Sequence, residues 1–360
     1  MAGMIFITIF FSVLFVTSIC FNVIVFYVIV KSKQLHTSQF VYMATIALSN
    51  TLTTLVVHPS VLAHMWLLAG QPLDDGHVTD YREKLSRAYI ETLGAGTMLP
   101  VCVSIYTLIV ATGDRLYAIT WPLKYHRRNS LGRTHKICTS IWLSATFVAL
   151  FPVLTRPHVR YDLQTLVWVT IAGRHSNVIY VVVLCVPMFL LWVMSFITYN
   201  KAGAGWQVRE IEGATTTRRR QSIRNANLQK CMTKTLVNVV GSWTVSILPL
   251  ACLLVVGLID PDVNLNSRRK LRSRGLTPLF VVEWFAFMSF TLHTLWCFVV
   301  LNKENRQFRR AKANLLCCYD SKEVARGSVA KRGSLLMSRQ KSNYPSLNLN
   351  FEMQVKNQNF

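Results

Sequence analysis

Seven long apolar stretches, separated by short polar connections, dominate the pattern of hydrophobic and polar positions along the chain. A helix that crosses the roughly 30 Å hydrocarbon core of a bilayer needs about 20 such residues. Backbone polar groups in lipid must find partners inside the protein, so we expect a bundle of helices. The predicted fold class is all-α, a seven-transmembrane helix bundle over residues 1–302. Its spans are Met4–Val30, Phe40–Leu68, Ala88–Gly113, Ile137–Leu154, Val178–Tyr199, Leu236–Ile259 and Pro278–Leu301.

The distribution of Lys and Arg predicts the orientation of this bundle. With the N-terminus outside, the inner loops and the tail hold 27 of the 39 basic residues, and the outer loops hold 11. This bias predicts a multi-pass protein of the plasma membrane with a cytoplasmic C-terminus. The basic last outer loop, residues 266–274, is the exception. The formal charge of +23 is explained by positive inner loops and contact with anionic lipids, rather than by nucleic-acid binding.

The first apolar stretch begins close to Met1, and no basic segment precedes it. It is longer than the apolar core of a cleaved signal peptide. We therefore expect it to be retained as a signal anchor beside Lys31 and Lys33, and we expect no large N-terminal ectodomain.

Residues 303–318 are predicted to form a short amphipathic eighth helix at the membrane surface. Phe308, Ala311 and Leu315 fall on one face among basic residues, which is typical of a helix that lies in the interface. Cys317 and Cys318 at its end are candidates for palmitoylation, which would make the chain a lipoprotein; the alternative is two unmodified thiols. Residues 319–360 are polar and are predicted to form a disordered cytoplasmic tail.

The third apolar stretch ends on adjacent charges, Asp114 and Arg115. Charged side chains are costly near a bilayer core, so this pair at the membrane rim indicates a functional site. The sequence continues as Asp-Arg-Leu-Tyr-Ala-Ile-Thr-Trp-Pro-Leu-Lys-Tyr over residues 114–125. Apart from its third position, it resembles the pattern Asp-Arg-Tyr-x-Ala-Ile-x-x-Pro-Leu-x-Tyr of rhodopsin-like (class A) G-protein-coupled receptors.

Further residues agree with this resemblance, which covers roughly residues 1–318. Asn22, Trp142, Pro187 and Pro249 stand where the family carries its Asn of the first helix, its Trp of the fourth and its prolines of the fifth and sixth. Each one alone is also explained by ordinary packing. A proline inside a helix weakens the backbone hydrogen-bond ladder and allows the helix to pivot. The resemblance therefore implies that these residues belong to a conformational switch.

The resemblance also implies partners and roles. In the resting state Arg115 would pair with Asp114, and a polar group on the sixth helix is a second candidate partner. When the sixth helix moves outward, Arg115 would contact a heterotrimeric G protein, with Pro122 and Leu123 of the second inner loop as further coupling residues. Arrestin and receptor kinases are additional implied partners.

Several departures from the family pattern identify the chain as a divergent member of that family. Asn50 replaces a buried Asp that holds Na⁺ in the family, and neither Asn50 nor Ser104 supplies a negative charge, so we predict no sodium site. The last helix reads Thr-Leu-Trp-Cys-Phe up to Phe298, where the family has Asn-Pro-x-x-Tyr. The toggle Trp of the sixth helix is replaced by Ile247, and Trp243 lies one turn earlier. Asn50, Ser104, Trp243 and Phe298 complete the predicted switch.

The outer halves of the helices contain the candidate ligand-binding residues. Thr97 stands where receptors for monoamines carry an Asp, which argues against a monoamine ligand. The last span contains no Lys, so a retinal Schiff base there is excluded. Outer loops of this size, with mixed charge and aromatic residues, favour a short peptide such as a neuropeptide or peptide hormone. The candidates are Glu283, Glu91, Thr97, His64 and Trp284.

Other classes of function are weighed against a receptor. A transporter or channel is the second class, but transporters tend to show internal repeats, and an odd number of spans without a repeat disfavours them. No metal-binding motif, nucleophile elbow or phosphate-binding loop is present, so we predict neither an enzyme nor a cofactor. A chemosensory or constitutively active orphan receptor remains an alternative within the receptor class. No cysteine falls in an outer loop, so we predict no extracellular disulfide bond.

We predict that Cys317 and Cys318 are acylated in cells. Two acyl chains anchor a helix stably, whereas one chain gives only marginal membrane binding. Acyl-biotin exchange should label the wild-type protein, and the Cys317→Ser/Cys318→Ser variant should lose that label. Equal labelling of the two proteins would contradict the prediction.

Overall fold

The computed structural model describes the chain as helices with one short hairpin. The described residues are 2–69, 87–121, 124–125, 130–154, 159–162, 167–170, 182, 185–201, 216–259 and 278–316. The helices are α1 (Ala2–Lys31), η1 (Lys33–Leu35), α2 (Ser38–Ala69), α4 (Arg87–Thr120), α6 (Leu131–Leu154), a helix at residues 185–201, α8 (Thr216–Ile259), α10 (Pro278–Glu304) and α11 (Arg306–Leu316).

The prediction of a seven-transmembrane helix bundle followed by a short amphipathic helix is confirmed, since the described residues of each predicted span lie on a helix. Four helical segments within the described residues are long and apolar enough to cross a membrane: Thr8–Lys31, Ser38–Pro59, Thr92–Thr120 and Cys231–Cys252. α6 exposes a row of large apolar side chains, as expected for a helix that faces lipid. They are Leu143, Phe147, Leu150, Phe151 and Leu154.

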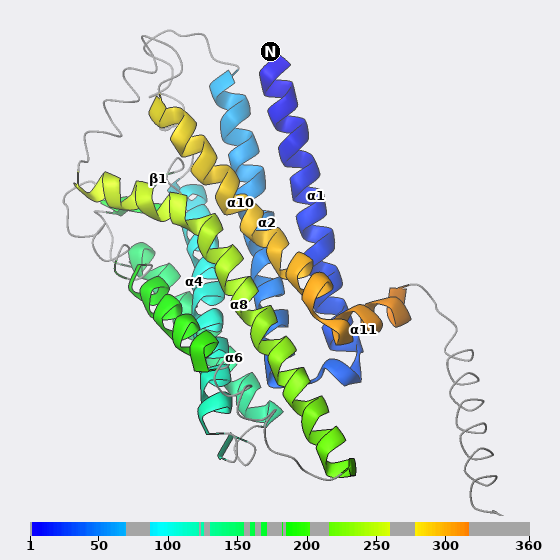
Figure 1. The fold of residues 1–360 in the computed structure, drawn as a ribbon. Helices are drawn as coiled ribbons and strands as arrows, with labels where there is room; N and C mark the ends of the chain where they lie inside the picture. The colour runs from blue at the N-terminus through cyan, green and yellow to red at the C-terminus, as the bar shows by residue number, and fades with distance from the viewer. Residues whose placement is uncertain are drawn as a thin grey trace, which may run out of the picture. The chain divides into compact units, whose positions relative to one another are not determined.

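Two compact units divide the chain, Met1–Arg309 and Arg310–Phe360. The predicted boundaries after residues 302 and 318 stay a prediction. Within the first unit α1 packs on α2, α2 on α4, α4 on α6, and α8 on α10 (Figure 1). Small residues permit some of these approaches: a Cβ added at Gly96 of α4 would lie 3.2 Å from Cγ1 of Val56 on α2.

The α4–α6 interface contains the predicted fourth-helix landmark. Cys102 and Val103 of α4 form a buried cluster with Ile141 and Ala145 of α6, and Trp142 packs against it. The indole is only half-buried, so its apolar contact with α4 is the role that the structure describes. This contact fixes the third and fourth spans side by side, and α4 carries the charged pair.

Two features differ from the sequence expectations. β1 (Val159–Asp162) and β2 (Val167–Thr170) form an antiparallel hairpin that pairs Val159 with Thr170, between the fourth and fifth predicted spans, where no strand was predicted. Val, Tyr, Trp and Thr favour strands, and these short runs carry no span-length signal. α8 begins at Thr216, long before the predicted start at Leu236, because Arg, Gln, Ala, Leu and Lys continue the helix beyond the apolar stretch.

Candidate functional site

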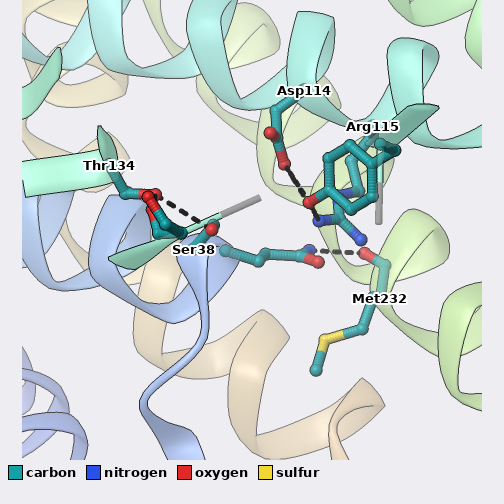
Figure 2. Close-up of polar contacts among 8 residues, drawn as sticks. Ser38, Asp114, Arg115, Thr134 and Met232 are labelled. Atoms are coloured by element: carbon teal, nitrogen blue, oxygen red, sulfur yellow. Dashed lines mark hydrogen bonds and ion pairs between the residues drawn. The ribbon is translucent and has the colours of Figure 1, made fainter. Parts of the chain in front are cut away.

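Three polar side chains meet near the C-terminal end of α4. Nη2 of Arg115 donates to Oδ2 of Asp114 at 2.9 Å and to the hydroxyl of Tyr125 at 2.8 Å. The Tyr125 hydroxyl in turn donates to Oδ2 of Asp114 at 2.9 Å. The Arg115 guanidinium carbon also lies 5.7 Å from the centre of the Tyr125 ring, within the range of a cation–π contact. The predicted pairing of Arg115 with Asp114 is thus confirmed (Figure 2).

The Tyr125 hydroxyl is a proton donor at this site. Burial raises the pKa of Tyr125 to about 12, so the phenol keeps its proton at physiological pH and can donate to the carboxylate. The Arg115 side chain is 7% exposed and that of Asp114 is 19% exposed. A guanidinium shielded to this extent requires a nearby negative charge, and Asp114 on the same helix supplies it. Sequence reasoning missed Tyr125 as a partner, although it is the last residue of the quoted motif.

Neighbouring helices meet close to this cluster. Nε2 of Gln39, in the first turn of α2, donates to the backbone carbonyl of Met232 on α8 at 2.8 Å. The hydroxyl of Thr134 on α6 donates to Oγ of Ser38 at 2.9 Å. Figure 2 shows Asp114 and Arg115 above Met232, with Ser38 and Thr134 to the left of them. Polar contacts therefore join the first turn of α2 to both α6 and α8 close to this arginine.

No acid on α8 can serve Arg115. The helix Thr216–Ile259 contains neither Asp nor Glu, so an ion pair between Arg115 and the sixth span cannot form. If Arg115 has a second partner on that helix, as expected from the sequence, the partner must be a neutral polar group. The charge of Arg115 is balanced within α4 itself.

A second polar cluster lies deep in the bundle and joins α1, α2 and α10. Nδ2 of Asn22 donates to the carbonyls of Ser18 and Thr294 at 2.9 and 2.8 Å. The Ser18 hydroxyl lies 2.7 Å from the Thr294 hydroxyl and 2.8 Å from that of Thr54. Nδ2 of Asn50 reaches Oδ1 of Asn22 at 3.4 Å. All five residues are almost completely buried, so the structure brings together two predicted switch residues, Asn22 and Asn50.

Ser104 belongs to a neighbouring contact between α2 and α4. The Ser49 hydroxyl donates to the carbonyl of Pro100 at 2.6 Å and lies 2.8 Å from the Ser104 hydroxyl. Asn50 adjoins Ser49 in sequence, so this contact continues the deep polar cluster toward α4. Every polar group in it is an amide, a hydroxyl or a carbonyl, and none carries a charge.

Two indoles that sequence reasoning missed attach the middle of the apolar part of α8 to its neighbours. Nε1 of Trp192 donates to the hydroxyl of Thr244 at 3.1 Å, and Nε1 of Trp296 donates to that of Ser246 at 2.9 Å. Both side chains are partly exposed, but the polar N–H of an indole in an apolar span still favours an acceptor, so the Trp, Ser and Thr residues inside the spans were the available signal. Trp243, a predicted switch residue, is buried beside these contacts.

The remaining switch candidates have separate surroundings. Phe298 of α10 stacks on Phe21 of α1, with ring centroids 4.1 Å apart. Pro249 lies inside α8, and Pro187 lies in the helix at residues 185–201. Both prolines are half-buried, and their roles in a switch stay predictions.

The ligand-binding and modification candidates are described only in part. Thr97 is buried, and its hydroxyl donates to the carbonyl of Leu93 within α4 at 2.8 Å. The other candidates lie outside the residues, or outside the side chains, that the structure describes. They are Glu91, His64, Glu283, Trp284, Pro122, Leu123, Cys317 and Cys318.

Comparison with known proteins gives the context of this site. A profile of the 7 transmembrane receptor (rhodopsin family) matches residues 21–293. Melanocortin receptor 4 of Danio rerio is similar, with 26% identity over 210 residues. The match spans 57% of this chain and 60% of that receptor's length.

We predict that Asn22→Ala destabilises the purified protein. The substitution removes the donor to the buried carbonyl of Thr294, and an unsatisfied buried group costs about 1–3 kcal/mol. The melting temperature in detergent or nanodiscs should fall. Thr17→Ala is the matched control, because the Thr17 hydroxyl bonds only to the Val13 carbonyl of its own helix at an exposed position. An equal loss of stability in both variants would contradict the proposed role of the cross-link.

Proposed function

Because the chain belongs to the rhodopsin family of seven-transmembrane receptors, we propose that it transmits the binding of an extracellular peptide to a heterotrimeric G protein. That family consists of multi-pass receptors of the plasma membrane, so the chain is a receptor and not an enzyme, transporter or channel. The proposal adds the class of ligand, the intracellular partner and the orientation.

The Asp114–Arg115–Tyr125 cluster carries the proposal of G-protein coupling. It holds a nearly buried guanidinium at the inner end of α4, where apolar packing alone would favour a neutral side chain. The guanidinium is bound by groups of its own helix and of the following loop, so a partner protein can take it over without first breaking an ion pair to α8. Asp114 and Tyr125 are then the residues that release it.

The N-terminus is proposed to lie outside, because the Lys and Arg residues are concentrated in the loops on the side of Arg115. The proposal of a peptide ligand has two supports. The similar protein is by its name a receptor for melanocortins, which are peptides. The hairpin β1–β2 lies near α4, and a short hairpin offers edge donors and acceptors that a peptide backbone can pair with.

A screen in transfected cells tests the ligand class. Peptide pools, with melanocortin peptides as one of them, would be applied while cAMP and calcium are recorded together. A concentration-dependent response in receptor-bearing cells alone supports the proposal. Responses only to non-peptide metabolites or odorants would favour a chemosensory receptor instead.

We predict that Arg115→Ala leaves surface expression largely intact and removes most stimulated nucleotide exchange. Loss of a coupling contact between two sites should lower the stimulated exchange by roughly 5- to 150-fold. Exchange on the G protein would be measured with matched amounts of surface receptor. Arg133→Ala is the control, since Arg133 is an exposed basic residue in the first turn of α6. If the Arg115→Ala variant stimulates nucleotide exchange as strongly as the wild type, the assignment of Arg115 to G-protein coupling is wrong.

We predict that agonist affinity is independent of sodium. The carboxylates of the helices lie far along the chain from the deep polar cluster, since Glu283 is 11 residues from Thr294 and Asp114 is 10 residues from Ser104. These separations correspond to about 15 Å or more along a helix. A cation moved into this uncharged site would lose several kcal/mol of hydration without a carboxylate to offset it.

The measurement is agonist affinity in NaCl against N-methylglucamine chloride at matched ionic strength, and equal values are expected. A drop in affinity that is specific to Na⁺ would refute the interpretation of Asn50.

A further inference from the structure

Several contacts attach α8 to the end of α10 at residues 231–234, where the apolar span Cys231–Cys252 begins; this start of the span is called the inner end of α8 below. Nζ of Lys234 lies 2.9 Å from Oε2 of Glu304, in an ion pair between the two helices. Sγ of Cys231 donates to the backbone carbonyl of Glu304 at 3.2 Å, and Nδ2 of Asn305 reaches Sδ of Met232 at 3.5 Å. All of these contacts involve one turn of α8 and two consecutive residues at the end of α10, so they act at a single point.

The ion pair is the charged contact at this point. The Glu304 side chain is 16% exposed, whereas that of Lys234 is 62% exposed. A carboxylate shielded to this degree favours a close cation. Arg309 is close in sequence, but its guanidinium donates to the carbonyls of Asn302 and Lys303. It thereby closes the end of α10, and Lys234 is the residue that the structure places on the Glu304 carboxylate.

This attachment differs from the charged cluster at Arg115. Asp114 and Arg115 stand on the same helix, and α8 contains no acid, so their ion pair does not restrain α8. Lys234–Glu304 instead spans two helices that pack along much of their length (Figure 1). Movement of the inner end of α8 away from α10 must separate these two charges.

We propose that the Lys234–Glu304 ion pair is a latch that holds the inner end of α8 against α10 in the resting receptor. The inference rests on the proposed coupling function, because the latch restrains the helix movement that admits the G protein. Glu304 is thus a positioning residue for coupling, and it acts through Lys234. The backbone and sulfur contacts of Cys231 and Met232 remain when either charge is removed, so the latch can be weakened without unfolding the site.

The size of the effect follows from the exposure of Lys234. An ion pair with one well-exposed partner contributes modestly to an equilibrium, so removing it shifts the resting state by roughly two- to fivefold. Lys234→Gln and Glu304→Gln should therefore each raise basal nucleotide exchange by about that factor. The double variant Lys234→Glu/Glu304→Lys restores the attraction with the charges exchanged, and its basal exchange should return toward the wild-type rate.

Basal exchange would be measured on purified receptor in nanodiscs, with Lys303→Gln as the matched control. Lys303 adjoins Glu304, is exposed, and takes no part in the pair, so its variant should keep the wild-type rate. The latch is overturned if both single variants exchange at the wild-type rate, if Lys303→Gln raises exchange equally, or if the exchanged double variant is as active as the single ones.

A second readout needs no G protein. The Cys231 thiol is half-buried against the Glu304 carbonyl, so its rate of alkylation by a maleimide, followed by peptide mapping, reports how often α8 leaves α10. The rate should rise roughly two- to fivefold in Lys234→Gln and Glu304→Gln. If the wild type supports no nucleotide exchange but the alkylation rate of Cys231 rises in both variants, the proposed G-protein coupling is wrong and the latch is still supported. Unchanged rates in both variants overturn the latch.

Discussion

Polar groups inside a bilayer have no water to bond to, so they must find hydrogen-bond partners within the protein. The packing of the helices in this structure depends on these hydrogen bonds between helices. The clearest case is the Asn22 amide, which donates to a carbonyl of its own helix and to the Thr294 carbonyl of α10. The acceptor on α10 is a backbone atom, so this contact does not depend on which side chain residue 294 carries. It fixes the position of α1 along the axis of α10. Ser18 and Asn50 extend it to α2, and Ser49 carries it to α4. Four helices are thus registered by uncharged groups.

Few carboxylates lie on the helices, and their positions decide what the receptor can do electrostatically. They are Glu91, Asp114, Glu283 and Glu304. Asp114 and Glu304 both lie at inner ends, and each is paired with a cation. The middle of the bundle has none, which is the basis for expecting no cation site there. The ion pairs of these carboxylates therefore lie at helix ends, and the deep cluster that joins the helices consists of neutral hydrogen bonds.

The sequence predicted the spans and the paired charges of Asp114 and Arg115, and it named Asn22 and Asn50 as switch residues without predicting their contact. These predictions succeeded because span length and motif spacing are local properties of the chain. It did not predict the partners Tyr125, Gln39, Trp296 or Thr294, since each contact joins residues far apart in the sequence or depends on a rotamer set by packing. The hairpin β1–β2 and the long inner extension of α8 were missed for a different reason: neither carries the apolar signal of a span.

The contacts of α8 indicate where it can bend. Trp192 and Trp296 hold Thr244 and Ser246, within about one turn of Pro249, while Lys234 is held by its ion pair with Glu304 of α10. Lys234 lies 15 residues from Pro249, about 22 Å along the helix axis. A kink of about 20° at a proline would therefore carry Lys234 roughly 8 Å sideways, enough to break every inner-end contact together. The indole contacts near the pivot would hardly move. A small bend at Pro249, near buried Trp243, would thus become a large displacement of Lys234, which is the movement that the proposed latch opposes.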